Sequence, residues 1–511
     1  MEITNKNTRR LACLIAAMGI LSYISLLFGD NLWMDEAFSA MIVKGSFSEM
    51  ITRSNQDTLP PLYNVLNWCM TKVFGFNSPA LRITSVLPMA GCLILSATVI
   101  RKKLGDMVSI IFSLCLSGAP WMFYYGTEIR MYSLSLFFVT LCMCAALDAP
   151  VFSKSERIMF ITGVLLSGWT HHFAFVAALF ICLYVLIMAI IHRKEDPSYI
   201  RNTLLSFGVI ILLYIPCFIN TLRQIKRVRG YFSMPDTDIQ TLLSCLKQPF
   251  ITKNTLLSVL LILMFVCAAA TGIFLSAKKK DLLCQKGLIL LCLYPFVTAF
   301  GYLAVLILKS NIFSQRYLIP TLGVFWLGFA MLASGSLRNI NDLIRYKAKG
   351  KNKDKTGGKT DGKTVKTDSG STQVTGIDKG PGALTAVCCL VILLAISIHS
   401  YVLTFADEYS SKVKEMRDFF AQNVKEGDRY LIVEDNYERE ICFRYYFPGF
   451  KKADWDEITG NETGTLWYVE VPGYADKTEL ITDHGYDYEL AGDFGFDRYE
   501  FKLYKLKKWA F

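Results

Sequence analysis

The sequence lacks the cysteine and histidine patterns of a metal or redox site. It contains 15 cysteines and five histidines, but no CxxC pair and no His/Cys ligand spacing. These absences leave zinc-binding and thiol-exchange motifs without support. Most of the cysteines lie within apolar runs, where a free thiol behaves as a small hydrophobic side chain. We therefore interpret the cysteines as packing residues.

The sequence also lacks internal repeats, and its carboxyl-terminal part contains no glycine-rich phosphate loop. Many secondary transporters are built from repeats, with charged or broken helices at mid-membrane. The absence of repeats therefore weighs against a transporter, and the absence of a phosphate loop leaves the carboxyl-terminal part without an assigned catalytic role.

The net charge of +11 is unevenly distributed along the chain. Residues 336–382 hold eleven Lys/Arg against five Asp/Glu, whereas residues 405–511 hold fifteen against twenty-three. A basic linker and an acidic tail on opposite sides of a membrane agree with the positive-inside rule. Nucleic acid is therefore not an expected partner.

Hydrophobic residues make up 53% of the 511 residues, and apolar runs of about 20 residues, the length that crosses a bilayer, recur along the chain. The first run follows a basic start and is not followed by a small-residue cleavage site, so we expect it to be retained. The pattern predicts a polytopic all-α membrane protein with about eleven transmembrane helices, near residues 11–28, 82–100, 107–125, 131–149, 157–170, 173–192, 202–220, 254–276, 286–308, 317–335 and 383–404.

Basic residues at span ends orient the chain in the cytoplasmic membrane. Arg101–Lys103, Arg193–Lys194, Lys278–Lys280 and the 336–382 linker are expected inside, with the amino terminus. The linker has no apolar periodicity, so we expect disorder there. Residues 405–511 alternate helical and strand patterns, which predict a small extracytoplasmic α/β domain.

One long polar segment, residues 29–81, lies between the first two spans on the predicted outer side. Its WMDEA motif carries Asp35 and Glu36, and Asp57 precedes Pro60 and Pro61. Neighbouring residues on a helix point about 100° apart, so we expect one acid to act as a base and the other to orient a neighbour or hold a cation. An ordinary solvated loop is the alternative. The stretch 60–75 is apolar but short and interrupted by polar residues, which favours an amphipathic helix at the membrane interface.

Further polar clusters lie on the same predicted face. The motif TEIRMYSL contains Glu128, Arg130 and Tyr132, where charges near membrane depth are more often functional than incidental. His171 and His172 occupy a turn and could bind a metal or accept a proton, although a satisfied interfacial pair is equally consistent. Cations that suit a lipid phosphate, or simply head groups, are Arg316 and the four residues Arg223, Lys226, Arg227 and Arg229.

The series of motifs resembles the GT-C superfamily of membrane glycosyltransferases. It is most similar to the bacterial branch related to protein O-mannosyltransferases and lipid A aminoarabinose transferases. The resemblance covers roughly residues 10–335 and rests on WMDEA, DTLPPLYNVLNW, SPALRITSVLPMAG, TEIRMYSL, THHF and SQRYLIP. It implies transfer of a sugar, with inversion, from a polyprenyl-phosphate donor to an acceptor on the outer membrane face.

The resemblance also implies roles for individual residues. Asp35 would be the general base and Glu36 its support, while Asp57 would help hold the donor or a cation. Many relatives carry His immediately before the paired prolines, but this chain has Leu59. This departure weakens the case for metal dependence, and a divalent cation stays an open question. The donor phosphate would be bound by the cations named above, with Glu128, Tyr132, His171 and His172 in supporting positions.

Two other functions stay open at this stage. One is a transporter or flippase of lipid-linked saccharides, and the other is a polymerase or ligase of surface glycans. The sequence identifies neither the sugar nor the acceptor, which could be a protein, a lipid or a cell-wall glycan.

Overall fold

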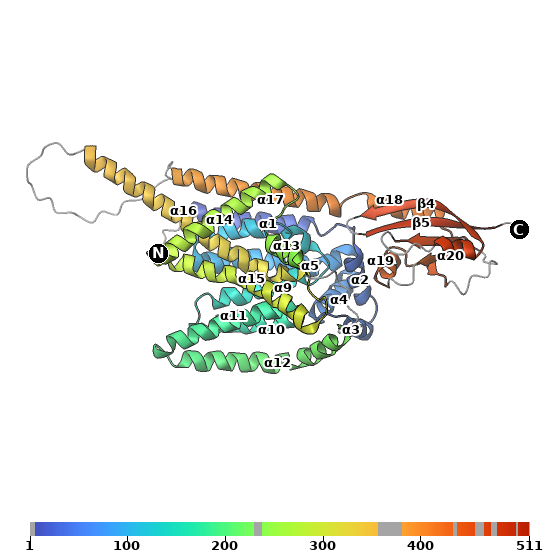
Figure 1. Ribbon diagram of the computed structural model, residues 1–511, viewed down its shortest axis with the longest axis horizontal. Helices are drawn as coiled ribbons and strands as arrows, with labels where there is room; N and C mark the ends of the chain where they lie inside the picture. Colours follow the sequence, from blue (N-terminus) through green and yellow to red (C-terminus); the bar gives the residue numbers. More distant parts are fainter. Residues whose placement is uncertain are drawn as a thin grey trace, which may run out of the picture.

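The computed structural model describes residues 6–228, 238–355, 381–432, 437–454, 464–471, 478–496 and 499–509. Apolar runs form long helices that lie side by side in one bundle (Figure 1). Within the described ranges, eight helices are long and apolar enough to cross a membrane. They contain α1 (Lys6–Ser25), α5 (Ser78–Leu95), α11 (His172–Ile191), α12 (Ser198–Val228), α14 (Thr255–Lys279), α15 (Leu282–Leu308), α16 (Ile319–Lys355) and α17 (Pro381–Glu408). The chain is a multi-pass membrane protein.

Three shorter helices, α7 (Asp106–Leu116), α9 (Tyr132–Ala146) and α10 (Lys154–Thr170), occupy the remaining predicted spans. At 1.5 Å per residue they are about 16 to 26 Å long, short of a full bilayer crossing. The predicted number of about eleven spans therefore stays a prediction. The expected span 107–125 is wrong as one continuous helix: the chain turns after α7 and restarts as α8 (Met122–Thr127), because Gly118 and Pro120 disfavour helix continuation.

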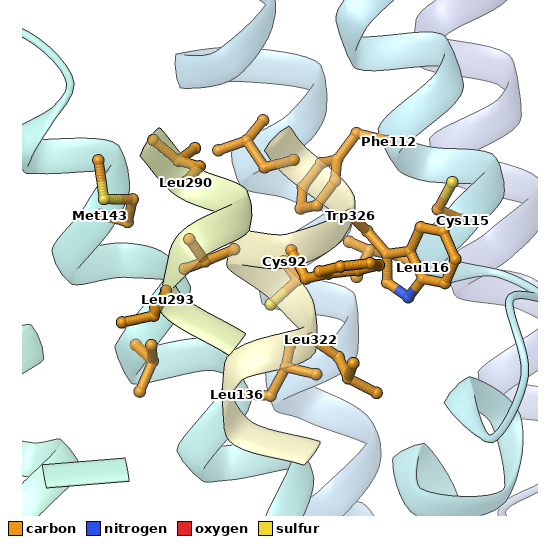
Figure 2. Close-up of a cluster of buried hydrophobic side chains, with 14 of the residues drawn as sticks. Cys92, Phe112, Cys115, Leu116, Leu136, Met143, Leu290, Leu293, Leu322 and Trp326 are labelled. Atoms are coloured by element: carbon orange, nitrogen blue, oxygen red, sulfur yellow. The ribbon is translucent and has the colours of Figure 1, made fainter. Parts of the chain in front are cut away.

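The centre of the bundle is α16. In the apolar part of this helix, 89% of the residues are buried. Trp326 of α16 packs among Phe112, Cys115 and Leu116 of α7 and Cys92 of α5 (Figure 2). All 15 cysteines are free and nine are buried, which agrees with their interpretation as packing residues. A tightly packed centre gives the surrounding helices a rigid support.

Short segments complete the membrane part of the described chain. A π-helical turn (Ser96–Ile100) and α6 (Arg101–Leu104) continue α5. A 3₁₀ turn (His192–Lys194) follows α11, α13 (Ile239–Lys247) precedes α14, and the 3₁₀ turn η3 (Gln315–Leu318) precedes α16. The last of these carries Arg316 to the end of the bundle.

Three helices, α2 (Met34–Val43), α3 (Phe47–Gln56) and α4 (Leu62–Phe74), lie between the bundle and the carboxyl-terminal sheet (Figure 1). With thirteen residues, α4 is about 20 Å long, too short to cross the membrane, as expected for residues 60–75. It buries Asn64, Asn67 and Thr71 against protein. At this end of the bundle, α2, α3 and α4 therefore form a layer with buried polar side chains next to the membrane helices.

The carboxyl-terminal region is a small α/β domain, as predicted. Its sheet has the order β2-β1-β3-β5-β4, with β1 parallel to β2 and β3, and the remaining pairs antiparallel. Strand β4 was not expected, because glycines interrupt its alternation of apolar and polar residues. The elements are α18 (Lys412–Asn423), α19 (Tyr437–Tyr446), α20 (Thr478–Asp483), β1 (Arg429–Ile432), β2 (Lys451–Lys452), β3 (Leu466–Glu470), β4 (Tyr486–Phe496) and β5 (Tyr499–Lys508).

The predicted linker begins later than expected. Helix α16 continues to Lys355, twenty residues beyond the predicted end of its span, because Leu, Arg, Lys and Ala in this stretch are good helix formers and extending an existing helix costs little. Residues 356–380 of the predicted linker lie outside the described residues.

The carboxyl-terminal domain and α2 share one hydrophobic core. Leu32, Ala37 and Ala40 are buried in the same cluster as Phe420 and Phe443. The amide of Leu32 donates a hydrogen bond to the hydroxyl of Tyr446 at 2.7 Å. The domain therefore packs directly on the helix that carries the acid pair.

Candidate active site

Asp35 lies between two arginines at the end of the bundle. It is in the first turn of α2, where the positive end of the helix dipole favours a carboxylate. Its side chain is 8% exposed and forms an ion pair with Arg316 of η3. The Nη2 atom of Arg130, which precedes α9, is 4.0 Å from the same carboxylate oxygen. Asp35 is thus no ordinary solvated loop residue.

Glu36 points to a different set of partners, as the helical spacing predicts. Its Oε1 atom accepts a hydrogen bond from the amide of Ile129 at 2.8 Å and is 3.2 Å from Nη1 of the buried Arg82. Its Oε2 atom accepts a hydrogen bond from the amide of Trp33 at 3.2 Å. Glu36 therefore orients its neighbours instead of facing the space beside Asp35.

The two arginines beside Asp35 retain capacity for an anion. Arg130 donates from Nη1 to the hydroxyl of Ser39 at 3.2 Å, and its buried Nε has no hydrogen-bond partner among the described residues. The guanidinium of Arg316 lies 5.9 Å from the ring centres of both Trp33 and Tyr317. Two guanidinium groups that face the same carboxylate can also pair with phosphate oxygens.

Glu128 and Tyr132 flank this pair of arginines. The carboxylate of Glu128 accepts a hydrogen bond at 2.9 Å from the indole nitrogen of Trp33. The hydroxyl of Tyr132 is buried and has no hydrogen-bond partner within the part of the chain that the structure describes. Glu128 thus fixes the residue before α2, and Tyr132 leaves a polar group for a ligand.

Asp57 lies in a short segment between α3 and α4 that polar side chains hold in place. The side-chain amide of Gln224 donates hydrogen bonds to the backbone carbonyls of Asp57 at 3.1 Å and Leu59 at 2.8 Å. The Nε2 atom of His172 is 3.1 Å from the carbonyl oxygen of Thr58. Burial raises the pKa of Asp57, while Arg130 and the amide of Thr58 oppose that rise. Asp57 is therefore close enough to the arginines to be influenced by their charge.

The two histidines have different environments. His171 ends α10, accepts a hydrogen bond from the amide of Phe173 at 3.2 Å, and its ring centre lies 5.9 Å from that of Tyr132 and 5.3 Å from that of Tyr317. Burial lowers the pKa of His171 well below its usual value, and His172, Arg130 and Arg316 lower it further. His171 is therefore neutral near pH 7.

A protein-bound divalent cation does not fit these side chains. Across the described ranges, no three His, Cys, Asp or Glu residues converge as a metal site would require. Asp35 faces two guanidinium groups, whose positive charge opposes a cation. The two histidines are engaged in helix capping and in holding the Asp57 segment.

An apolar cavity of about 320 Å³ opens beside the charged residues. Its polar end is formed by Thr58, which follows Asp57, and by Tyr317, which follows Arg316, together with His171. The apolar walls come from the membrane helices α11, α12 and α15 and include Phe175, Val176, Tyr214, Phe218, Phe300, Ala304 and Leu308. Such a cavity can accept a hydrocarbon chain from the membrane while an attached head group meets the charges.

Two of the four basic residues predicted near the end of α12 are described by the structure, and both lie outside this arrangement. Arg223 and Lys226 are exposed, and among the described residues neither forms an ion pair with an acid of the site. The side chain of Arg227 and the whole of Arg229 lie outside the described residues. Gln224, which lies between these cations in the sequence, does contact the Asp57 segment. The sequence analysis did not predict a role for it.

Sequence reasoning also missed Arg82 and Glu408. Arg82 is completely buried in α5 and is 2.6 Å from Glu408 at the end of α17. An arginine within an apolar run is a signal for a polar partner, so Arg82 could have been found. No local pattern marked Glu408, because its partner is 326 residues away.

Comparisons with solved structures agree with this architecture. No protein-family model matches the chain, and no curated protein matches its sequence. The crystal structure of apo ArnT from Cupriavidus metallidurans is similar with a TM-score of 0.60 and 11% identity, over 96% of this chain and 97% of that one. The same protein bound to undecaprenyl phosphate matches with a TM-score of 0.58, 11% identity and the same coverage. The chain therefore shares the fold of ArnT over nearly its whole length.

Proposed function

We propose that this protein is an integral membrane glycosyltransferase that moves a sugar from a polyprenyl-phosphate donor to an acceptor. The observation that carries the proposal is the pairing of Asp35 with Arg130 and Arg316 next to an apolar cavity, which is lined by Tyr317, the residue after Arg316. The fold it shares with ArnT, which has been solved with undecaprenyl phosphate bound, supports the same class of lipid-linked donor.

The cavity and the arginines bind different parts of the donor. Its polyprenyl chain lies against the apolar walls, and its phosphate pairs with Arg130 and Arg316. Asp57, which precedes the cavity-lining Thr58, contacts the sugar or phosphate portion. The buried Tyr132 hydroxyl supplies a further hydrogen bond. Each interaction uses a group that the described residues leave available or only partly engaged.

The reaction is a single displacement. Asp35 takes the proton of the acceptor hydroxyl while that oxygen attacks the anomeric carbon, and the bond from this carbon to the phosphate oxygen breaks. Such general-base assistance contributes about 10²–10⁴-fold. The leaving polyprenyl phosphate gains negative charge, which Arg130 and Arg316 stabilise. One displacement inverts the anomeric centre, and no step uses a metal ion.

The site faces the outer side of the cytoplasmic membrane in this proposal. It lies at the end of the bundle that carries the acidic carboxyl-terminal domain (Figure 1), whereas the basic span ends lie at the other end. The acceptor, whether protein, lipid or cell-wall glycan, approaches from that outer side.

The test is sugar transfer by the purified full-length protein in detergent from a panel of polyprenyl-phosphate pentoses and hexoses. The proposal predicts transfer, or slow transfer to water, from at least one donor, with inversion detected by NMR of the product. Retention of configuration would contradict direct displacement. No reaction with any donor, together with movement of lipid-linked saccharide across vesicle membranes, would favour a transporter.

A further inference from the structure

All three nitrogens of the Arg82 guanidinium group form hydrogen bonds inside the protein. Its Nε donates to the carbonyl of Gly29 at 3.2 Å, Nη1 to the carbonyl of Thr127 at 3.1 Å, and Nη2 to the carbonyl of Asn31 at 3.0 Å. It also pairs with the carboxylates of Glu36 at 3.2 Å and Glu408 at 2.6 Å. One buried side chain therefore joins three segments that are distant in sequence.

Two of these segments carry the reactive groups of the proposed site. The segment from Gly29 leads directly into the helix turn of Asp35. The segment from Thr127 leads to Arg130, and the amide of Ile129 within it donates to Glu36. Arg82 and Glu36 therefore connect the backbone beneath Asp35 to the backbone beneath Arg130.

Glu408 brings the last membrane helix into the same cluster. Its carboxylate approaches both terminal nitrogens of Arg82, at 2.8 and 2.6 Å. Nearby, Asn31 donates to the hydroxyl of Ser410 at 2.6 Å, two residues after the end of α17. The chain that leads into the carboxyl-terminal domain is thus attached to the segment that precedes α2.

We propose that Arg82, Glu36 and Glu408 form a buried positioning triad that sets Asp35 relative to Arg130. Through this triad, the end of α17 controls the geometry of the reaction site. This inference rests on the proposed transferase function for its kinetic consequence, but its structural consequence is independent of any substrate. None of the three residues needs to contact the donor: they act through Asp35 and Arg130.

Loss of the triad should lower turnover more than donor binding. The donor phosphate is held by Arg130 and Arg316, and Arg316 lies on η3, a different segment from those that the triad joins. Proton removal by Asp35, in contrast, requires its carboxylate at the correct distance from the bound donor. A displacement of about 1 Å can cost about 10²-fold in rate.

The structural experiment is hydrogen exchange on the full-length protein in detergent. Glu408→Ala should raise exchange more than about tenfold in peptides covering residues 29–37 and 127–131, while peptides of α7 and α9 change little. Glu408→Gln, which keeps one hydrogen-bonding oxygen, should give a smaller change. The matched control is Arg417→Gln, because Arg417 pairs with Asp30 of the same segment but is 44% exposed.

The kinetic experiment measures kcat and the donor KM for the same variants. Glu408→Ala should reduce kcat about 10²-fold with KM changed less than about threefold, and its effect should shrink in a Glu36→Gln background, since both residues act through Arg82. Unchanged exchange in residues 29–37, or exchange that rises equally throughout the chain, would overturn the triad. If the wild-type protein transfers no sugar, the proposed function fails while the exchange result still decides the triad.

Discussion

Two neighbouring carboxylates occupy opposite kinds of environment. Asp35 faces two arginines, of which Arg130 retains an unpartnered buried nitrogen in the described structure. Glu36 shares a single arginine, Arg82, with Glu408, and that guanidinium is saturated by backbone and carboxylate oxygens. The first region has hydrogen-bonding capacity left on Arg130 and an adjoining cavity, whereas the second is closed. The difference indicates that the region around Asp35 can bind a ligand and react, whereas the region around Glu36 holds the reactive groups in position.

The comparison predicts the largest effect for Asp35→Asn. The amide cannot accept the acceptor's proton, so kcat should fall about 10²–10⁴-fold in protein that is still folded and monodisperse in detergent. The measurement is the initial rate of transfer at saturating donor. Equal rates in the two proteins would remove Asp35 from the mechanism.

Arg82→Met should show the reverse pattern, with stability as its principal loss. Removing the guanidinium leaves two buried carboxylates and several carbonyl groups without their partner, and breaking a buried ion pair costs about 3–5 kcal/mol. Thermal unfolding and the yield of monodisperse protein measure this loss. If Arg82→Met were as stable as wild type, the cluster of Arg82, Glu36 and Glu408 would not have the structural role assigned to it.

Arg316→Ala should weaken donor binding without a comparable loss of stability. Hydrogen bonds to charged groups contribute about 1.5–3 kcal/mol, which corresponds to about a 10- to 150-fold rise in the donor Kd. Arg223→Ala is the matched control, since Arg223 is a nearby exposed cation outside the site. Equal losses in both variants would indicate general attraction of the lipid phosphate to surface charge.

His171 should make stability depend on pH in the acidic range. Its pKa is lowered by burial in the folded protein, so the unfolded chain binds a proton more readily below about pH 6.5. Stability should therefore fall as pH decreases from about 6.5, by up to about 1.4 kcal/mol per pH unit from this group. Comparing the unfolding temperatures of wild type and His171→Asn at pH 5 and pH 7 measures the effect, and identical pH profiles would contradict it.

The smallest effect is expected for Arg417→Gln. Arg417 links α18 to Asp30 beside the closed region, yet both side chains are largely exposed, and exposed ion pairs contribute about 0–1 kcal/mol. Unfolding in detergent should be nearly unchanged. A loss as large as that of Arg82→Met would show that the domain contact, and not the buried triad, supports the segment before α2.

The sequence was informative where a local pattern has a direct physical meaning. Apolar runs located the membrane helices, and the 100° separation of adjacent helical residues anticipated the different directions of Asp35 and Glu36. Short apolar runs identified β1 and β3 and an alternating pattern identified β5, whereas β4, interrupted by glycines, and the two-residue β2 were not predicted.

Long-range contacts could not be anticipated in the same way. Glu408 belongs to the site because α17 returns to the end of α5, and Gln224 because α12 passes the segment after Asp57. Neither residue carries a local signal. The cluster of basic residues around Gln224 attracted attention through its charge, but charge alone did not indicate which side of the helix faces the protein.

The most direct test is the affinity of sugar-free undecaprenyl phosphate for wild type and for Asp35→Asn, measured at neutral pH in the same detergent. The phosphate and the Asp35 carboxylate would compete for the same guanidinium groups, so removing the carboxylate's charge should leave binding equally tight or make it tighter, although transfer is lost. Clearly weaker binding by Asp35→Asn would contradict the account, because it would mean that the lipid phosphate does not use the arginines that Asp35 engages.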